Sequence, residues 1–218
     1  TMDGGGDRKT SAVYIGEDGR LTEIASSISM SLAGLYAHIT YILGFLPHEH
    51  EYKLMGLAPY ANKKYAQAVS DLFEQFFEYS SENNMVLTNT RRYPNLGDTK
   101  GPNKLVWIED LYKEVLNVRF DTLCAGVQMF VEKMILKWVE TTIESTGIKK
   151  VLLSGGFFMN VKANQLIAES TAVDHVNCFP SCGDETNAFG AAFLGFQDID
   201  VRDRQGSKSI DFRNFCIG

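Results

Sequence analysis

The stretch Leu153-Ser154-Gly155-Gly156-Phe157-Phe158-Met159-Asn160 ends a short apolar segment with two consecutive glycines. This pattern predicts a β-strand that turns sharply into a helix. The N–H groups at such a turn can approach and bind a nucleotide. A tight strand-to-helix turn without any ligand would need the same glycines. The candidate nucleotide contacts are Ser154, Gly155, Gly156 and Asn160.

Helical and extended patterns alternate on both sides of this turn. The expected elements are a helix capped by Asp121 and ended by Gly147, a buried strand at 150–154, a helix at about 160–169, a strand at 175–179 and a helix at 186–195. This alternation is typical of an α/β fold with a mostly parallel sheet covered by helices. Ligands of such sheets bind beyond the carboxyl ends of the strands, and the glycine-rich loops 154–156 and 181–184 follow two such ends.

The first half of the chain predicts β-strands followed by helices. The expected elements are β-rich runs around a turn at 17–20, a helix at about 31–43 capped by Ser29 or Ser31, a short helical piece near 53–57, an amphipathic helix at 64–80 and a strand near 85–88. Residues 80–105 are rich in Asn, Gly, Pro and Thr, which indicates a long variable insert.

Two further motifs contain aspartates beside glycines. In Asp3-Gly4-Gly5-Gly6-Asp7, the backbone can approach a phosphate and an aspartate can hold a metal ion, although a plain glycine hairpin would look alike. Asp184 precedes a helix rich in small residues and is either its N-cap or a metal ligand. Cys182, nearby, suits a packing role better than a nucleophilic one because no histidine is close in sequence.

The segment from His50 to Tyr60 contains Lys53 among small residues. Lys53 could meet a phosphate as a point charge, or it could be a solvated loop lysine paired with Glu51. His48 and His50 form a pair at a spacing of two, which is weak evidence for a metal site.

Composition excludes several classes of function. The net charge is −6, from 21 basic and 27 acidic residues, and no basic cluster predicts a nucleic-acid surface. No apolar run is long enough for a membrane span, and the start lacks the pattern of a signal peptide. Four scattered cysteines are typical of reduced thiols in a cytoplasmic protein. A glycine turn at residue 3 needs a strand before it, so we expect the sequence to begin inside a domain.

The four motifs, in this order, resemble the nodulation-type O-carbamoyltransferases. The matching segments are Asp3–Asp7, Glu51–Pro59, Gly155–Asn160 and Gly183–Ala192. The resemblance implies an actin-like ATPase (ribonuclease H-like) fold with an incomplete first lobe, related to the enzymes that form threonylcarbamoyladenosine in tRNA. It also implies that residues 1–196 are the C-terminal portion of the ATP-binding domain and that 197–218 lead as an exit linker to a missing C-terminal domain.

The resemblance implies a reaction and roles for residues. Carbamoyl phosphate and ATP would form carbamoyl adenylate, and the carbamoyl group would pass to a hydroxyl of a sugar-like acceptor. A divalent metal, iron or magnesium, would bind Asp3 and Asp184. The nucleotide would contact Gly4, Gly5, Gly6, Ser154, Gly155, Gly156 and Asn160, and Glu51 and Lys53 would be catalytic.

One departure from the family limits these expectations. The family also uses a His-x-x-x-His motif, which is absent from these residues and would lie upstream of Asp3. Two aspartates alone hold a transition metal poorly. We therefore expect this fragment to bind nucleotide weakly and to turn over nothing.

Two alternatives remain open from the sequence. A sugar-kinase-like phosphotransferase would release ADP, whereas carbamoyl adenylate chemistry releases pyrophosphate. A non-catalytic nucleotide-binding module would show no metal-dependent binding of ATP.

Overall fold

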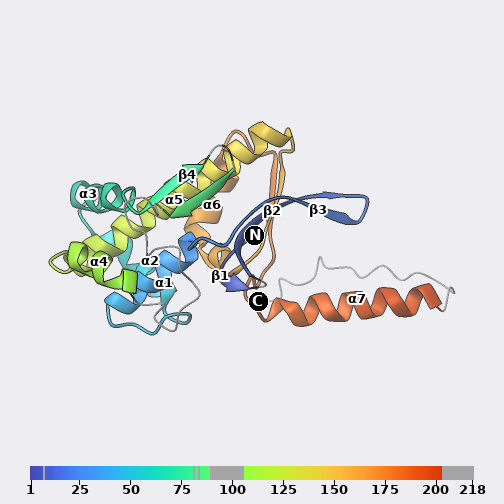
Figure 1. Cartoon of the computed structure of the whole chain (residues 1–218), viewed down its shortest axis with the longest axis horizontal. Coiled ribbons are helices and arrows are strands. Elements are labelled where there is room, and N and C mark those ends of the chain that lie inside the picture. The colour runs from blue at the N-terminus through green and yellow to red at the C-terminus, as the bar shows by residue number, and fades with distance from the viewer. Residues whose placement is uncertain (7, 81, 83, 89–105, 203–218) are drawn as a thin grey trace.

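The computed structural model describes residues 1–6, 8–80, 82, 84–88 and 106–202 as a mixed α/β structure of helices and small sheets (Figure 1). The strands are β1 (Met2–Gly6), β2 (Lys9–Glu17), β3 (Arg20–Ser27), β4 (Phe77–Ser80), β5 (Met85–Thr88), β6 (Lys150–Leu153) and β7 (His175–Cys178). The helices are α1 (Leu32–Ile42), α2 (Glu51–Leu57), α3 (Lys63–Phe73), α4 (Val106–Val115), α5 (Phe120–Thr146), α6 (Val161–Glu169) and α7 (Thr186–Arg202). Asp7, residues 89–105 of the expected insert and residues 203–218 of the expected linker lie outside the described residues.

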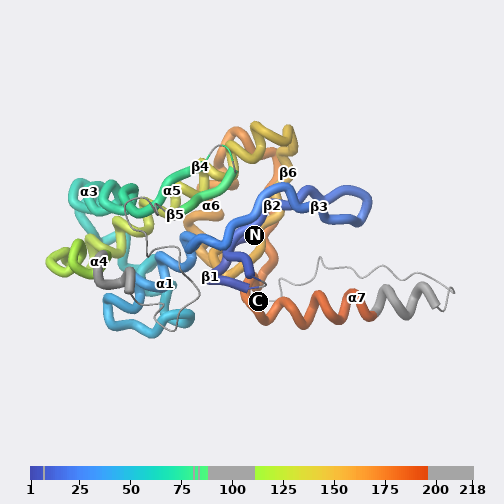
Figure 2. Tube along the Cα trace, in the orientation of Figure 1, coloured from blue at the N-terminus to red at the C-terminus, as the bar shows by residue number. Residues whose placement is uncertain are grey.

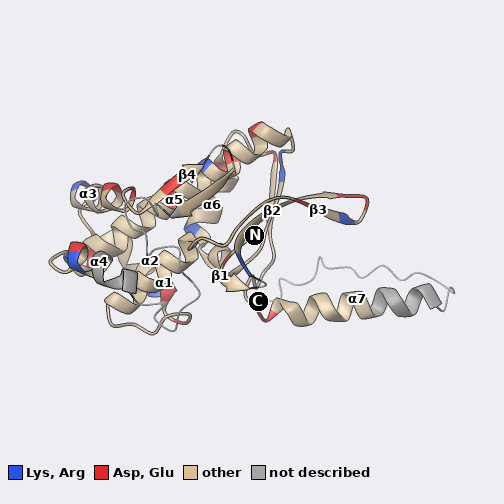
Figure 3. Ribbon diagram, in the orientation of Figure 1, with Lys and Arg blue, Asp and Glu red and all other residues tan. Residues whose placement is uncertain are grey.

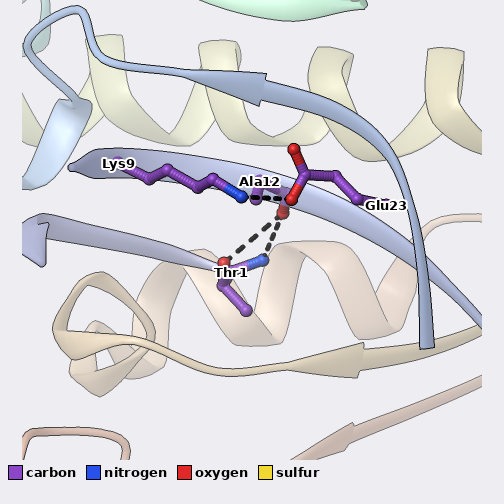
Figure 4. Close-up of polar contacts among 4 residues, drawn as sticks. All are labelled: Thr1, Lys9, Ala12 and Glu23. Atoms are coloured by element: carbon purple, nitrogen blue, oxygen red, sulfur yellow. Dashed lines mark hydrogen bonds and ion pairs between the residues drawn. The ribbon is translucent and has the colours of Figure 1, made fainter. Parts of the chain in front are cut away.

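The N-terminal sheet has the order β1-β2-β3 and is antiparallel throughout. The turn expected at 17–20 is confirmed and joins β2 to β3. Across the sheet, Thr1 N donates to Ala12 O at 2.7 Å, and Lys9 Nζ pairs with Glu23 (Figure 4). The Thr1 contact fixes the start of β1 on β2, and the Lys9–Glu23 pair joins β2 to β3.

The expectation of a mostly parallel sheet is wrong for the described residues. They form a three-stranded antiparallel sheet, the antiparallel pair β4–β5 and the parallel pair β6–β7. The short turns between β1, β2 and β3 impose antiparallel pairing, because a parallel pair needs a crossover connection such as α6. A hydrogen bond of 3.0 Å from Met2 N to Ser154 O joins β1 to the end of β6.

Strand β6 is only half buried, contrary to expectation. Leu153 is buried, whereas Lys150 is exposed and the Leu152 side chain is 74% exposed. Successive side chains of a strand point to opposite faces, so the apolar run marks a strand with one covered face.

Helix α5 is the centre of the core. It contacts α2, α3 and α6 along its length (Figure 2). The Phe130 ring lies 5.7 Å from the Phe73 ring and 5.6 Å from the Phe77 ring, and Trp138 donates from Nε1 to Asn84 O at 2.9 Å. Gly147, with φ of 70°, ends the helix as predicted.

Several predicted boundaries shift in the structure. The helix expected at 64–80 ends at Phe73, because Phe77 joins β4 and packs on Phe130 instead of continuing the helix. Arg119, not Asp121, occupies the N-cap position of α5. The Asp121 carboxylate accepts from Thr122 N at 2.8 Å and pairs with Arg119 Nε at 2.9 Å.

The predicted N-cap of α1 agrees with the structure, whereas α2 and α7 are longer than predicted. Ser31 is confirmed as the N-cap of α1, since its side chain accepts from Gly34 N. Helix α2 begins at Glu51, and α4 was not predicted. Helix α7 continues to Arg202, past the expected domain end at 196, while the domain division itself stays a prediction.

Charged residues of both signs are distributed over the described helices and strands (Figure 3). Lys and Arg lie mixed with Asp and Glu along the described ribbon (Figure 3). Within the described ranges, no helix is long and apolar enough to cross a membrane.

Close packing of α3 on α5 predicts a large effect of Gly126→Ala. A Cβ at Gly126 would lie 2.4 Å from Val69 Cγ1, so the helices would have to separate. We expect unfolding in urea to show a loss of about 1–3 kcal/mol. Gly56→Ala in α2, which meets nothing within 4 Å, is the matched control and should be neutral or stabilising. Equal effects of both variants would contradict this packing.

Burial of His38 predicts a loss of stability in mild acid. Burial lowers the pKa of His38 from 6.5 to about 4, and Nδ1 contacts Gly34 O at 2.5 Å. The unfolded chain therefore binds the proton more tightly. The contribution is fully present above pH 6.5 and is lost as the pH falls toward 4, by roughly 1–3 kcal/mol. Urea unfolding at several pH values should show a shallower profile for His38→Gln and an unchanged profile for His175→Gln, which alters an exposed side chain.

Candidate functional site

A cavity of about 390 Å³ lies where β1, α1, α2 and the loops after β6 and β7 meet. Its lining joins segments that are far apart in the sequence. The lining residues are Asp3, Gly4, Ala33, Tyr36, Ala37, His48, Glu49, Glu51, Tyr52, Met55, Gly156, Phe157, Met159, Asn160, Gly183, Asp184 and Glu185.

The Asp3 carboxylate joins β1 to the turn after β6, and the glycines 4–6, which were predicted to form a turn, belong to strand β1. The two oxygens of Asp3 accept from Gly4 N at 2.6 Å and from Gly156 N at 3.2 Å. The Asp3 carbonyl also accepts from Ser31 Oγ, the N-cap of α1. Asp3 therefore fixes three elements at one edge of the cavity.

Gly155 allows this contact because it has no side chain. Its φ of 101° is strained for other residues, and a Cβ there would lie 2.2 Å from Met2 O. Gly155 thus packs against the β1 backbone, while Gly156 lines the cavity. The two glycines of the turn have different tasks: one permits contact between strands, and the other faces the site.

Asn160 closes the loop that begins at Gly155. It is the N-cap of α6, and its Oδ1 accepts from Ala163 N at 3.1 Å. Its amide also forms two hydrogen bonds with Gln128 on α5. Sequence reasoning missed Gln128 because it lies within the apolar-periodic pattern of α5 and only tertiary contact reveals its partner.

The loop before α2 enters the cavity through His48. His48 has a φ of 69°, and its N–H donates to the Glu51 carboxylate at 2.6 Å. Its ring lies beside Gly4. Glu51 therefore both lines the cavity and stabilises a strained turn.

Lys53 lies away from the cavity lining. Its Nζ lies 5.3 Å from the centre of the Phe45 ring and 5.9 Å from that of Tyr52. Such contacts stabilise a cation on aromatic faces. The catalytic role expected for Lys53 stays a prediction.

The loop before α7 brings Asp184 into the cavity lining. Asp184 is exposed, and its carbonyl accepts from Asn187 N at 3.1 Å. The Ser181 hydroxyl donates to Glu185 and lowers the pKa of that carboxyl. Behind this loop, burial raises the pKa of the Cys182 thiol to about 12, which fits a packing role.

The structure thus brings some of the predicted site residues together and leaves others outside. Asp3, Gly4, Glu51, Gly156, Asn160 and Asp184 share the cavity lining. Gly5, Gly6, Lys53, Ser154 and Gly155 do not line it. Tyr36 and His48 line it without having been predicted as site residues.

The lining is acidic. It contains the carboxylates of Asp3, Glu49, Glu51, Asp184 and Glu185, and it contains His48 but neither Lys nor Arg. Carboxylates gathered at one cavity repel a polyphosphate unless a cation lies between them. An anionic ligand would therefore need to bring a metal ion.

The carboxylates suit a magnesium ion that arrives with phosphate better than a resident iron. Asp3 and Asp184 offer hard oxygen ligands, and Mg²⁺ is commonly bound by one or two carboxylates plus substrate phosphates and water. Among the residues that the structure describes, no three His, Cys, Asp or Glu side chains group as a metal site. Iron would need further ligands, preferably imidazoles.

Comparison with known proteins gives a family. The chain matches the family model described as the carbamoyltransferase N-terminus over residues 1–193.

Three relatives extend this match. Nodulation protein NolNO of Sinorhizobium fredii is 31% identical over 196 residues, which cover 89% of this chain and 27% of that protein. An uncharacterized protein of Synechocystis is 30% identical over 195 residues, covering 88% and 31%. Nodulation protein NolO of Bradyrhizobium diazoefficiens is 27% identical over 195 residues, covering 88% and 33%. The chain spans about a third or less of the length of these curated relatives.

The crowding at Gly155 predicts a severe effect of Gly155→Ala. The new Cβ would meet the Met2 backbone and adopt a strained φ, so we expect a loss of about 3 kcal/mol or more in thermal or urea unfolding. Gly147→Ala is the matched control. Gly147 also has a positive φ but meets nothing within 4 Å, so its loss should be only about 1 kcal/mol. Similar losses would show that strain alone, and not contact with β1, matters at Gly155.

Proposed function

The chain belongs to the carbamoyltransferase family, as part of its N-terminal domain, and from this premise we propose that it forms the ATP site of an O-carbamoyltransferase. Water would first cleave carbamoyl phosphate to carbamate and inorganic phosphate. The carbamate oxygen would then attack the α-phosphorus of ATP, giving carbamoyl adenylate with pyrophosphate as the leaving group. A hydroxyl of a sugar-like acceptor would then attack the carbamoyl carbon and release AMP. The rest of the longer polypeptide, in the cytoplasm, would complete this reaction.

The observation that carries the proposal is the meeting of Asp3, Gly156 and Asp184 around one cavity. These residues come from three motifs that are separated by most of the chain. Asp3 is hydrogen-bonded to Gly156 N, so β1 and the turn after β6 form one surface. The N–H groups of Gly4 and Gly156 already donate to Asp3, so the carboxylates of Asp3 and Asp184 would hold the phosphates through the accompanying cation.

The strand arrangement supports an actin-like ATPase fold with an incomplete first lobe. The order β3-β2-β1 continues through the Met2–Ser154 hydrogen bond to β6, which pairs in parallel with β7. In this proposal β3, β2, β1, β6 and β7 are parts of one larger sheet, and the cavity is lined by β1 and by the loops that follow β6 and β7. That position is where α/β sheets bind their ligands.

The charge of the cavity supports a requirement for a divalent metal. We place Mg²⁺ with the ATP phosphates between Asp3 and Asp184. The ion would neutralise part of the acidic lining and polarise the phosphates for attack. Glu51 would keep the His48 turn in place, and Lys53 would act only after leaving the rings of Phe45 and Tyr52.

Replacement of one carboxylate tests this site. We expect Mg²⁺-dependent binding of ATP, measured by isothermal titration or NMR, to be weak in this chain. Asp184→Asn should weaken it at least about tenfold, because a charged ligand of the ion is lost. Asp174→Asn, which removes an exposed carboxylate outside the cavity, is the control and should bind as the wild type does.

Two outcomes would contradict the proposal. Equal binding of ATP with and without Mg²⁺ would favour a module that binds nucleotide without a metal. In the longer polypeptide, release of ADP instead of pyrophosphate would favour a sugar-kinase-like phosphotransferase.

A further inference from the structure

A buried amide on α5 contacts the wall of the cavity. Gln128 is 5% exposed and lies below Tyr36 and Asn160, both of which line the cavity. It hydrogen-bonds to both of them and to Glu132, one helical turn further along α5. A buried polar group with four hydrogen bonds in the core helix is costly to misplace, so its orientation is well determined.

Glu132 sets the orientation of the Gln128 amide. A carboxylate only accepts, so the Gln128 Nε2 group must face it, and the distance to Glu132 Oε1 is 2.8 Å. The same Nε2 donates to Asn160 Oδ1 at 3.0 Å. The Gln128 oxygen then accepts from the Tyr36 hydroxyl at 2.7 Å and from Asn160 Nδ2 at 3.1 Å.

A second contact independently fixes Asn160 in the same orientation. The backbone N–H of Ala163 donates to Asn160 Oδ1, which therefore has to be the oxygen and not the nitrogen. Asn160 Oδ1 accepts from two donors, and one N–H of Nδ2 is bound to Gln128. The polar capacity that remains on Asn160 is the second N–H of Nδ2.

We propose that Gln128 is a positioning residue that commits Asn160 to present a hydrogen-bond donor to the ligand of the cavity. The part of the ligand that meets Asn160 is then an acceptor, an oxygen or ring nitrogen of the nucleotide. The identity of this ligand rests on the proposed function, whereas the orientation of Asn160 does not.

Substitution of Gln128 by Glu would reverse this arrangement. The introduced carboxylate would have no donor for Asn160 Oδ1, and its charge would face both that oxygen and Glu132. Asn160 would then lose the hydrogen bond that Gln128 Nε2 donates to its Oδ1 and keep only the bond from Nδ2 to a carboxylate oxygen, or it would turn its amide around. Either change replaces the donor in the cavity with a poorly placed group.

The test is NMR of the ¹⁵N-labelled chain with ATP and Mg²⁺. In the wild type, we expect the side-chain N–H signals of Asn160, assigned by their loss in Asn160→Asp, to exchange slowly with water and to shift during the titration. Gln128→Glu should remove the slow exchange and weaken ATP binding about tenfold, the effect of one misplaced hydrogen bond.

Two further variants separate positioning from general stability. Gln165→Glu alters the same i,i+4 Gln–Glu pair on the exposed face of α6, and it should leave the Asn160 signals and ATP binding unchanged. Gln128→Met keeps the length of the side chain and adds no charge, so it serves if Gln128→Glu does not fold. It should also release the Asn160 amide.

The outcomes distinguish the two proposals. Wild-type exchange of the Asn160 amide and wild-type ATP affinity in folded Gln128→Glu or Gln128→Met would overturn the positioning role. Release of the Asn160 amide in these variants, with no wild-type signal shifting on addition of ATP and Mg²⁺, would support the positioning role and overturn the nucleotide function.

Discussion

The site depends on the contact between the start of β1 and the turn after β6. Met2 N donates to Ser154 O, and the Asp3 carboxylate accepts from Gly156 N, so a few hydrogen bonds join segments more than 150 residues apart. Closing so long a loop is entropically costly. The contact persists because Met2 and Leu153, at its two ends, belong to the same hydrophobic core as the buried face of α5. The contact requires glycine at position 155, since any side chain there would displace the β1 backbone.

The contact also concentrates negative charge. The fold places carboxylates from three separate segments, Asp3, Glu49 with Glu51, and Asp184 with Glu185, around one cavity. Such a cavity has little affinity for a bare polyphosphate, but it favours a phosphate–cation pair. The acidic lining by itself disfavours a nucleotide, and it is therefore a reason to expect that ATP binds only together with a metal ion.

Much of the local structure could be predicted from sequence, because local chemistry decides it. Ser31 caps α1, Gly147 ends α5, and the Gly155–Gly156 turn lies between a strand and a helix, as their residue types require. The continuation of helix at 77–80 was wrong because Phe77 gains more by packing on Phe130 than by extending a helical pattern. The expectation of a mostly parallel sheet was wrong because it rested on the helix–strand alternation of the second half, whereas the strands predicted around the turn at 17–20 pair antiparallel.

The candidate site was less predictable, because it depends on distant partners. Asp3 and Asp184 could be singled out by their neighbouring glycines, but nothing local to Gln128, which lies within the apolar pattern of α5, reveals its polar partners. Its importance follows from its hydrogen bonds to Tyr36 of α1 and to Asn160, so that α5 supplies part of the apolar core and also the amide that holds two residues of the cavity lining. Because the same helix serves both, a change in core packing around Phe130 would also move the amide that orients Asn160. Stability and ligand recognition are therefore coupled in this fold through α5.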